Sequence, residues 1–190
     1  RVGADAAFPI EELDEKLPDF LANRETLYHT LGRDADFDER ITGWLNSLRH
    51  RRNEPPAAPR AVVDIRDPLH EMRLRKRPEE IALMREASRI SSEAHTLAMQ
   101  HCQPGMHEYE LQAIIEYHFQ RNGADFPAYP SIVGAGANAT CLHYTENSDV
   151  IAEDAIVLID AGCELDFYAG DITRSFPASG SFTGVQRDVY

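Results

Sequence analysis

The sequence lacks several features that would each point to a class of protein. It contains only three cysteines, an odd number with no CxxC pair, which indicates free, mostly buried thiols in a reducing compartment. No run approaches the ~18 apolar residues of a membrane span, and nothing resembles a signal peptide. Positive charge is scarce, with 19 Lys and Arg against 32 Asp and Glu. The net charge of −13 argues against nucleic acid or an anionic membrane as the main partner. Because the thiols are expected to be free and no signal peptide is found, we expect a cytoplasmic protein.

What is present describes an ordinary globular chain. Hydrophobic residues make up 43 % and charged residues 27 %, and 190 residues can form one or two domains. The one basic run, Arg73 to Arg77, predicts a solvated connector. The chain opens on Arg1 and closes on "SFTGVQRDVY", where Thr183 is expected to cap a helix that stops after about two turns. We therefore expect a piece of a longer protein.

The first 72 residues alternate helical and strand patterns. Residues 9–21 and 38–50 have helical spacing, the latter with Asp36 or Asp38 as the expected cap, and short strands are expected within 25–32 and at 61–65. The second helix is expected to bury one apolar face, formed by Ile41, Trp44, Leu45 and Leu48. The character of the sequence changes at the basic run. We place a domain boundary there, giving domains 1–72 and 73–190.

The second part begins with helices and continues with strands. Pro78 occupies a first helical position, and the apolar stripe after it continues for roughly 25 residues until Pro104-Gly105. Residues 107–121 form a second helix, with Gly123 just past its end. From Phe126 the pattern is that of strands, with a hairpin turn expected among the glycines and asparagine of 131–147. The fold class predicted is α+β, with helices packed on one face of an antiparallel sheet.

Two aspartates stand at the centre of the apolar stretch "LIDAGCELDFYAGDITRSFP", residues 158–177. If its strands pair about a turn at Leu165-Asp166, Asp160 lies directly opposite Asp171, with Cβ atoms ~4.5–5.5 Å apart. Two buried carboxylates that close repel each other unless a proton or a cation lies between them. A pair of divalent ions ~3.5–4 Å apart would suit this geometry.

Other interpretations of the pair stay open at this point. An aspartate at a strand end often caps a turn, and Asp171 could form a simple ion pair with Arg174. A protonated dyad of the aspartic-protease kind is a third interpretation, without the glycine-loop motif expected around it. Two carboxylates also make an incomplete shell, because hard divalent ions take about six ligands.

His143, in "CLHYTEN", is the other candidate site residue. It lies in a polar cluster after apolar strand residues and near a glycine-rich turn. Such a position suits a group that donates to a developing charge. The alternative is a histidine of the core or of the sheet surface.

Together these motifs resemble the bacterial Xaa-Pro aminopeptidase (aminopeptidase P) family of the pita-bread metallopeptidases. The segments that carry the resemblance are "LHEMRLRKRPEEIALMREASRISSEAH", "PGMHEYELQA", "GADFPAYPSIVGAGANATCLHYTEN", "LIDAGCELDFYAGDITRSFP" and "QRDVY". It covers residues 60–190, and residues 1–60 are compatible with part of the family's N-terminal domain. Residues 73–190 would then be the first half of a pita-bread catalytic domain.

The resemblance implies a metal-dependent hydrolase that removes the N-terminal residue from peptides with proline in second position. It implies two divalent ions, typically manganese, and an ion-bridging water or hydroxide as nucleophile. Asp160 would bind one ion through both oxygens, Asp171 would bridge the two ions, and His143 would lie on the substrate side. Tyr129, in "PAYPSIV", would border the site, although its ring could instead only be packing. A homo-oligomeric full-length protein is also implied.

The chain departs from the family pattern in its N-terminal domain, which is expected to lack its first strands, and in its metal ligands. One His and two Glu ligands are also required, and in the family these lie beyond the position of Tyr190. The 190 residues alone are therefore expected to be inactive. A prolidase, a methionine-aminopeptidase-like relative and a non-catalytic binding module of the same fold are the alternatives.

Overall fold

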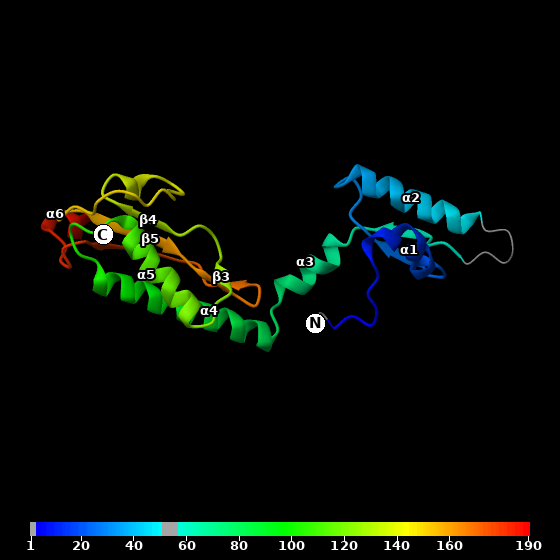
Figure 1. The fold of residues 1–190 in the computed structure, drawn as a ribbon, viewed down its shortest axis with the longest axis horizontal. Coiled ribbons are helices and arrows are strands. Elements are labelled where there is room, and N and C mark those ends of the chain that lie inside the picture. Colours follow the sequence, from blue (N-terminus) through cyan, green and yellow to red (C-terminus); the bar gives the residue numbers. More distant parts are fainter. Residues whose placement is uncertain (1–2, 51–56) are drawn as a thin grey trace. The chain divides into compact units, whose positions relative to one another are not determined.

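The computed structural model describes residues 3–50 and 57–190. These residues form two compact units that divide after Arg75 (Figure 1). Helix α3 (Arg66–Leu74) spans the position between residues 72 and 73 where the sequence predicts a boundary. No helix in these described ranges has both the length and the apolar character needed to cross a bilayer.

The first unit is small, and its core forms on the apolar face of helix α2 (Ala35–Arg49). Besides α2 and α3, its elements are η1 (Ile10–Glu12), α1 (Leu13–Leu21), β1 (Thr26–Tyr28) and β2 (Ala61–Val63). Strands β1 and β2 pair in parallel. The predicted apolar face of α2 is confirmed, since Ile41, Trp44, Leu45 and Leu48 are all buried.

The cap of α2 differs from the prediction. Asp34 accepts a hydrogen bond from the backbone N–H of Phe37 at 3.0 Å, so the helix begins earlier than expected. Asp38 cannot serve as the cap because its carboxylate binds His29 Nε2 at 2.6 Å and the N–H of Gly32 at 2.7 Å.

The second unit has two long helices and one short one, α4 (Pro78–His101), α5 (Glu108–Arg121) and α6 (Gly184–Val189). Pro78 stands at the predicted first position of α4, and the carboxylate of Glu80 accepts from the N–H of Arg77 at 2.6 Å. The predicted Thr183 cap of α6 is confirmed, because its hydroxyl accepts from the N–H of Gln186.

Six strands of this unit form two antiparallel sheets. The sheet orders are β4-β5-β8 and β3-β6-β7, with the strands β3 (Phe126–Pro127), β4 (Ile132–Ala135), β5 (Ile156–Ala161), β6 (Cys163–Leu165), β7 (Tyr168–Ala169) and β8 (Ile172–Pro177). Burial alternates along β5, where Val157, Ile159 and Ala161 point into the core.

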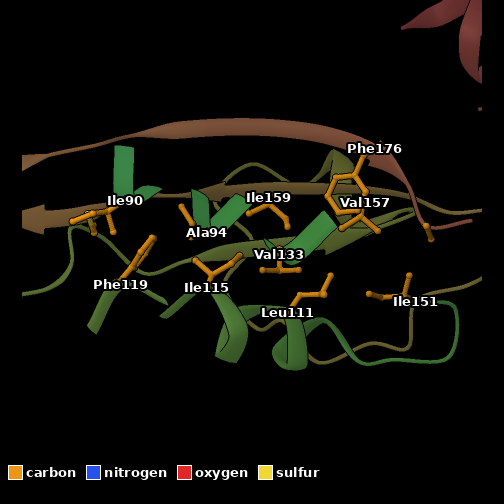
Figure 2. Close-up of a cluster of buried hydrophobic side chains, with 14 of the residues drawn as sticks. Ile90, Ala94, Leu111, Ile115, Phe119, Val133, Ile151, Val157, Ile159 and Phe176 are labelled. Carbon is orange, nitrogen blue, oxygen red and sulfur yellow. The ribbon is translucent and has the colours of Figure 1, made fainter. Parts of the chain in front are cut away.

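The core lies between the sheets and helices α4 and α5. Figure 2 shows Ile90 and Ala94 of α4 and Leu111, Ile115 and Phe119 of α5 among the strand side chains. The predicted α+β fold, with its helices on one face of an antiparallel sheet, is confirmed. The alternate residues of β5, Ile156, Leu158 and Asp160, are only partly buried and lie on the opposite face of the sheet.

The hairpin predicted within residues 131–147 is wrong. β4 ends at Ala135 and pairs with β5, and between them lies a long segment whose only regular element is the 3-10 helix η2 (Asn138–Thr140). Leu142, expected as an apolar strand residue, is 88 % exposed. Instead of pairing with a neighbouring strand, the segment is held by polar side chains, with Asn138 and Tyr144 bonded to Glu108 of α5 and Asn147 bonded to the backbone of Val133 in β4.

Candidate metal centre

The register between β5 and β8 places the two aspartates close together but not directly opposite. Asp160 faces Thr173 and Ala161 faces Ile172, so the predicted direct pairing with Asp171 is wrong. Asp171 precedes the first residue of β8. The predicted sharing of one sheet face holds, because the register differs by two residues and two is the side-chain period of a strand.

The turn explains this difference. The hairpin turns at Asp166 and Phe167, which have φ of 46° and 70°, one residue later than predicted. A two-residue hairpin loop of type I′ requires positive φ at both central positions. Moving the turn by one residue moves every cross-strand pair by two positions.

Glycine packing holds the Asp171 end of the hairpin against α4. A Cβ at Gly170 would lie 2.5 Å from the carbonyl carbon and oxygen of Ala87, and one at Gly162 would lie 2.5 Å from the carbonyl oxygen of Gly170. Only glycine permits this close approach of backbones. Asp171 is therefore set by direct contact between the strand backbone and a helix.

One tyrosine hydroxyl joins the two carboxylates. Tyr129 Oη lies 2.6 Å from Asp160 Oδ1 and 2.8 Å from Asp171 Oδ1. Partial burial, and then the two carboxylates, raise the pKa of Tyr129 well above its usual range, so the hydroxyl stays protonated. Because it has a single proton, it can donate to only one carboxylate at a time. The three oxygens together form an acceptor-rich cluster.

The carboxylates are less buried than the apolar stretch around them indicates. Asp160 is half-buried and Asp171 is exposed, because both lie on the sheet face opposite α4 and α5. The expectation of two buried carboxylates is therefore wrong. The strand residues that surround them are buried only on the helical side.

A cavity of about 430 Å³ brings the four predicted residues together. It is lined by Tyr129, Pro130, Ile132, His143, Thr145, Asp160 and Asp171. A neighbouring cavity of about 320 Å³ shares Ile132, His143 and Asp160 with it and adds the loop residues Cys141 and Leu142. A larger cavity of about 800 Å³ lies beside α6, and none of the four predicted residues is among those that line it.

His143 enters the cavity from the loop and not from a strand. Its side chain is exposed and its backbone φ is 56°, a left-handed conformation uncommon for a residue other than glycine. The alternative of a core histidine is excluded by this exposure. The loop must hold His143 in this conformation against its intrinsic preference.

The sequence reasoning missed the residues that hold this loop. Glu108 is fully buried and accepts from the hydroxyl of Tyr144, the residue after His143, at 2.7 Å. One signal could have found it, since Glu108 begins the stripe of Leu111, Ile115 and Phe119 that faces the core at helical spacing. A carboxylate on an apolar stripe requires donors.

The donor set fits a hard divalent cation in kind but not in number. Carboxylate oxygens suit Mg²⁺, Ca²⁺ or Mn²⁺. The Tyr129 hydroxyl donates only one proton to Asp160 and Asp171, so their other carboxylate oxygens remain acceptors. Across residues 3–50 and 57–190, no three His, Cys, Asp or Glu side chains converge as a metal-binding group. The alternative ion pair is not found, since Arg174 instead donates to the carbonyl of Thr173 at 2.7 Å.

Comparison with known proteins decides the family. Residues 82–190 match metallopeptidase family M24, which is more than half of the chain. The chain belongs to this family.

Similar proteins are named as aminopeptidases and cleaving peptidases. The chain is 45 % identical over all 190 residues to Xaa-Pro aminopeptidase of Escherichia coli K12, and covers 43 % of that protein. It is 33 % identical over 187 residues to intermediate cleaving peptidase 55, mitochondrial, of Arabidopsis thaliana, and covers 36 % of it. The chain thus spans less than half the length of these relatives.

The solved structures that this chain resembles are also those of aminopeptidases. The structure of Pseudomonas aeruginosa aminopeptidase PepP superposes with a TM-score of 0.87 at 46 % identity, covering 97 % of this chain and 42 % of that one. A zinc-substituted E. coli aminopeptidase P in complex with product superposes with a TM-score of 0.88 at 45 % identity, covering 98 % and 42 %. The chain shares its fold with one part of aminopeptidase P.

Proposed function

We propose that this chain supplies two of the metal ligands, Asp160 and Asp171, of a metal-dependent aminopeptidase that hydrolyses N-terminal Xaa-Pro bonds. The single observation that carries the proposal is the Tyr129 hydroxyl shared between Asp160 and Asp171, in one cavity with His143. The similarity to Xaa-Pro aminopeptidases, high over the whole chain, supports this substrate class over that of a prolidase or methionine aminopeptidase. The intact carboxylate pair argues against a non-catalytic binding module.

In this proposal the two aspartates have different roles. Asp160 would be a ligand of one divalent ion and Asp171 a ligand shared by two, most readily Mn²⁺. One His and two Glu from outside these 190 residues complete the shell. When bound, the ions supply Lewis acidity and lower the pKa of the attacking water.

The substrate side is formed by residues of this chain. His143 donates from its ring to the charge that develops at the scissile bond or to the departing imino nitrogen. A Xaa-Pro bond has no amide N–H, so recognition cannot rest on donation from that nitrogen. Tyr129 orients the carboxylates through its hydroxyl and borders the same cavity.

We also propose the domain organisation, the cellular location and the oligomeric state of the whole protein. Residues 1–72 would belong to an N-terminal domain of the aminopeptidase P type and residues 73–190 to the first half of a pita-bread domain. The three free cysteines support a cytoplasmic location. Homo-oligomerisation, measurable by light scattering, is proposed for the full-length protein.

The test is peptide cleavage by a polypeptide that carries this sequence together with the remaining ligands. With added Mn²⁺, we expect release of the first residue from a Xaa-Pro peptide and much slower release from the matching Xaa-Ala peptide. Equal rates on both peptides would overturn the proline specificity. Full activity after exhaustive chelation would overturn the metal requirement.

A further inference from the structure

We propose that Glu108 is a positioning residue that holds the loop bearing His143 over the carboxylate pair. The inference rests on the proposed function in one respect, namely that His143 acts on the substrate. It adds a residue that does not itself line the cavity, at the first turn of α5.

Glu108 has an environment built for a carboxylate. It is fully buried and accepts four hydrogen bonds, the donors being the N–H of Ala135 at 2.7 Å, Asn138 Nδ2 at 3.1 Å, Tyr144 Oη at 2.7 Å and the N–H of Asp149 at 3.0 Å. A buried carboxylate without such donors would be strongly destabilising. Its place at the helix N-terminus also favours negative charge.

These donors flank His143 in the chain. Asn138 lies before it, in η2, and Tyr144 and Asp149 lie after it. Asn138 Nδ2 also contacts Tyr144 Oη at 3.0 Å, so the two sides of the loop are joined at Glu108. The loop is thereby tied to a rigid helix on both sides of His143.

The backbone adds a second tie at the end of the loop. The N–H of Glu108 donates to the carbonyl of Asp149 at 3.0 Å, and the N–H of Ile151 donates to the carbonyl of Met106 at 2.8 Å. Asn147, also buried, accepts from the N–H of Val133 at 2.9 Å and joins the same stretch to β4. Glu108 therefore governs the part of the loop that contains His143.

The strained backbone at His143 explains why such an anchor is needed. A left-handed φ of 56° is disfavoured for a residue with a Cβ, and an exposed loop would relax from it. The adjacent Tyr144 is fixed to Glu108 through its hydroxyl, which limits the rotation available to the preceding residue. An error of about 1 Å in the position of a group that contacts substrate can reduce the rate ~100-fold.

The first test is a double-mutant cycle in the polypeptide with the complete ligand set. Tyr144→Phe removes one donor to Glu108 and keeps the ring, so it is milder than Glu108→Gln and should fold. We expect Tyr144→Phe to lower kcat/KM for a Xaa-Pro peptide about tenfold while the bound metal stays unchanged. In the His143→Ala background the same change should cost less than about twofold, because Tyr144 acts through His143.

A matched control separates positioning from general stability. Ser91→Ala removes a buried hydroxyl that accepts from the N–H of Cys163 at 3.0 Å and touches neither the loop nor the cavity. We expect it to lower the thermal midpoint and leave kcat/KM unchanged. A Tyr144→Phe loss that is equal with and without His143 would overturn the inference.

The second test needs no catalysis. Backbone hydrogen exchange should speed up across residues 138–149 in Tyr144→Phe and in Glu108→Gln, while α4 stays protected. Unchanged exchange in this loop would overturn the inference whatever the kinetics. A His143→Ala variant with full activity would instead overturn the proposed role of His143, and the exchange result would still decide whether Glu108 holds the loop.

Discussion

At the scale of single residues, the contact between Tyr129 and the two aspartates has the clearest chemical consequence. The sequence predicted that Tyr129 either borders the site or packs its ring, and the structure gives its hydroxyl two carboxylate partners. Nothing in the residue pattern could locate this contact, because Tyr129 is 31 residues from Asp160 in the chain. Tertiary packing brings these residues together.

We predict that Tyr129→Phe lowers the free energy of unfolding at pH 7 by about 1.5 kcal/mol, the lower end of the contribution of a hydrogen bond to a charged group, because Asp171 is exposed. The raised pKa of Tyr129 sets the pH dependence. The unfolded chain ionises its tyrosines near pH 10 while folded Tyr129 stays neutral, so this stabilisation is complete below about pH 10 and declines above it. Urea unfolding of both proteins from pH 7 to pH 11 measures it. A difference that grows above pH 10 would contradict the account.

The cysteines give a second prediction at this scale. Burial raises the pKa of Cys163 and of Cys102, whereas Cys141 is exposed beside His143. We expect one of the three thiols to react fast with a disulfide reagent in the native state, and Cys141→Ser to abolish that fast phase. A fast phase that survives this substitution would show that the interior is open.

At the scale of helices and strands, the sequence predicted most of what periodicity controls. The apolar face of α2, the start of α4 at Pro78 and the shared sheet face of Asp160 and Asp171 are as expected. The turn position, and with it the exact cross-strand partner of Asp160, depended on two residues that adopt positive φ, one of them Phe167. A phenylalanine in that conformation is not signalled by propensity.

Glycine contacts between α4 and the hairpin give the prediction at this scale. Gly170→Ala should lower the free energy of unfolding by about 2–3 kcal/mol, because the new methyl group overlaps the backbone of Ala87. Gly184→Ala is the matched control, since a Cβ there meets nothing within 4 Å, and it should change stability by less than about 0.5 kcal/mol. Equal effects in denaturant unfolding would show that the hairpin does not press on α4.

At the scale of the whole molecule, the chain supplies only part of the proposed metal site. It spans less than half of the aminopeptidases it resembles, and its described residues bring together two carboxylates but no third metal-binding side chain. We predict that the 190-residue chain alone binds Mn²⁺ far more weakly than the complete protein and shows no measurable Xaa-Pro cleavage. Calorimetric Mn²⁺ titration and a peptide assay check both. Turnover near that of a complete family member would mean that no further ligands are needed.

The most direct measurement of the central claim is metal stoichiometry in the polypeptide with the complete ligand set. Elemental analysis should find two Mn²⁺ per chain in the unaltered protein and in His143→Ala, because His143 is proposed to act on the substrate. Asp171→Asn should retain at most one, because Asp171 is the carboxylate proposed to serve both ions. Full metal occupancy in Asp171→Asn, or equal loss of metal in Asp171→Asn and His143→Ala, would contradict the assignment of Asp160 and Asp171 as the metal ligands of this chain.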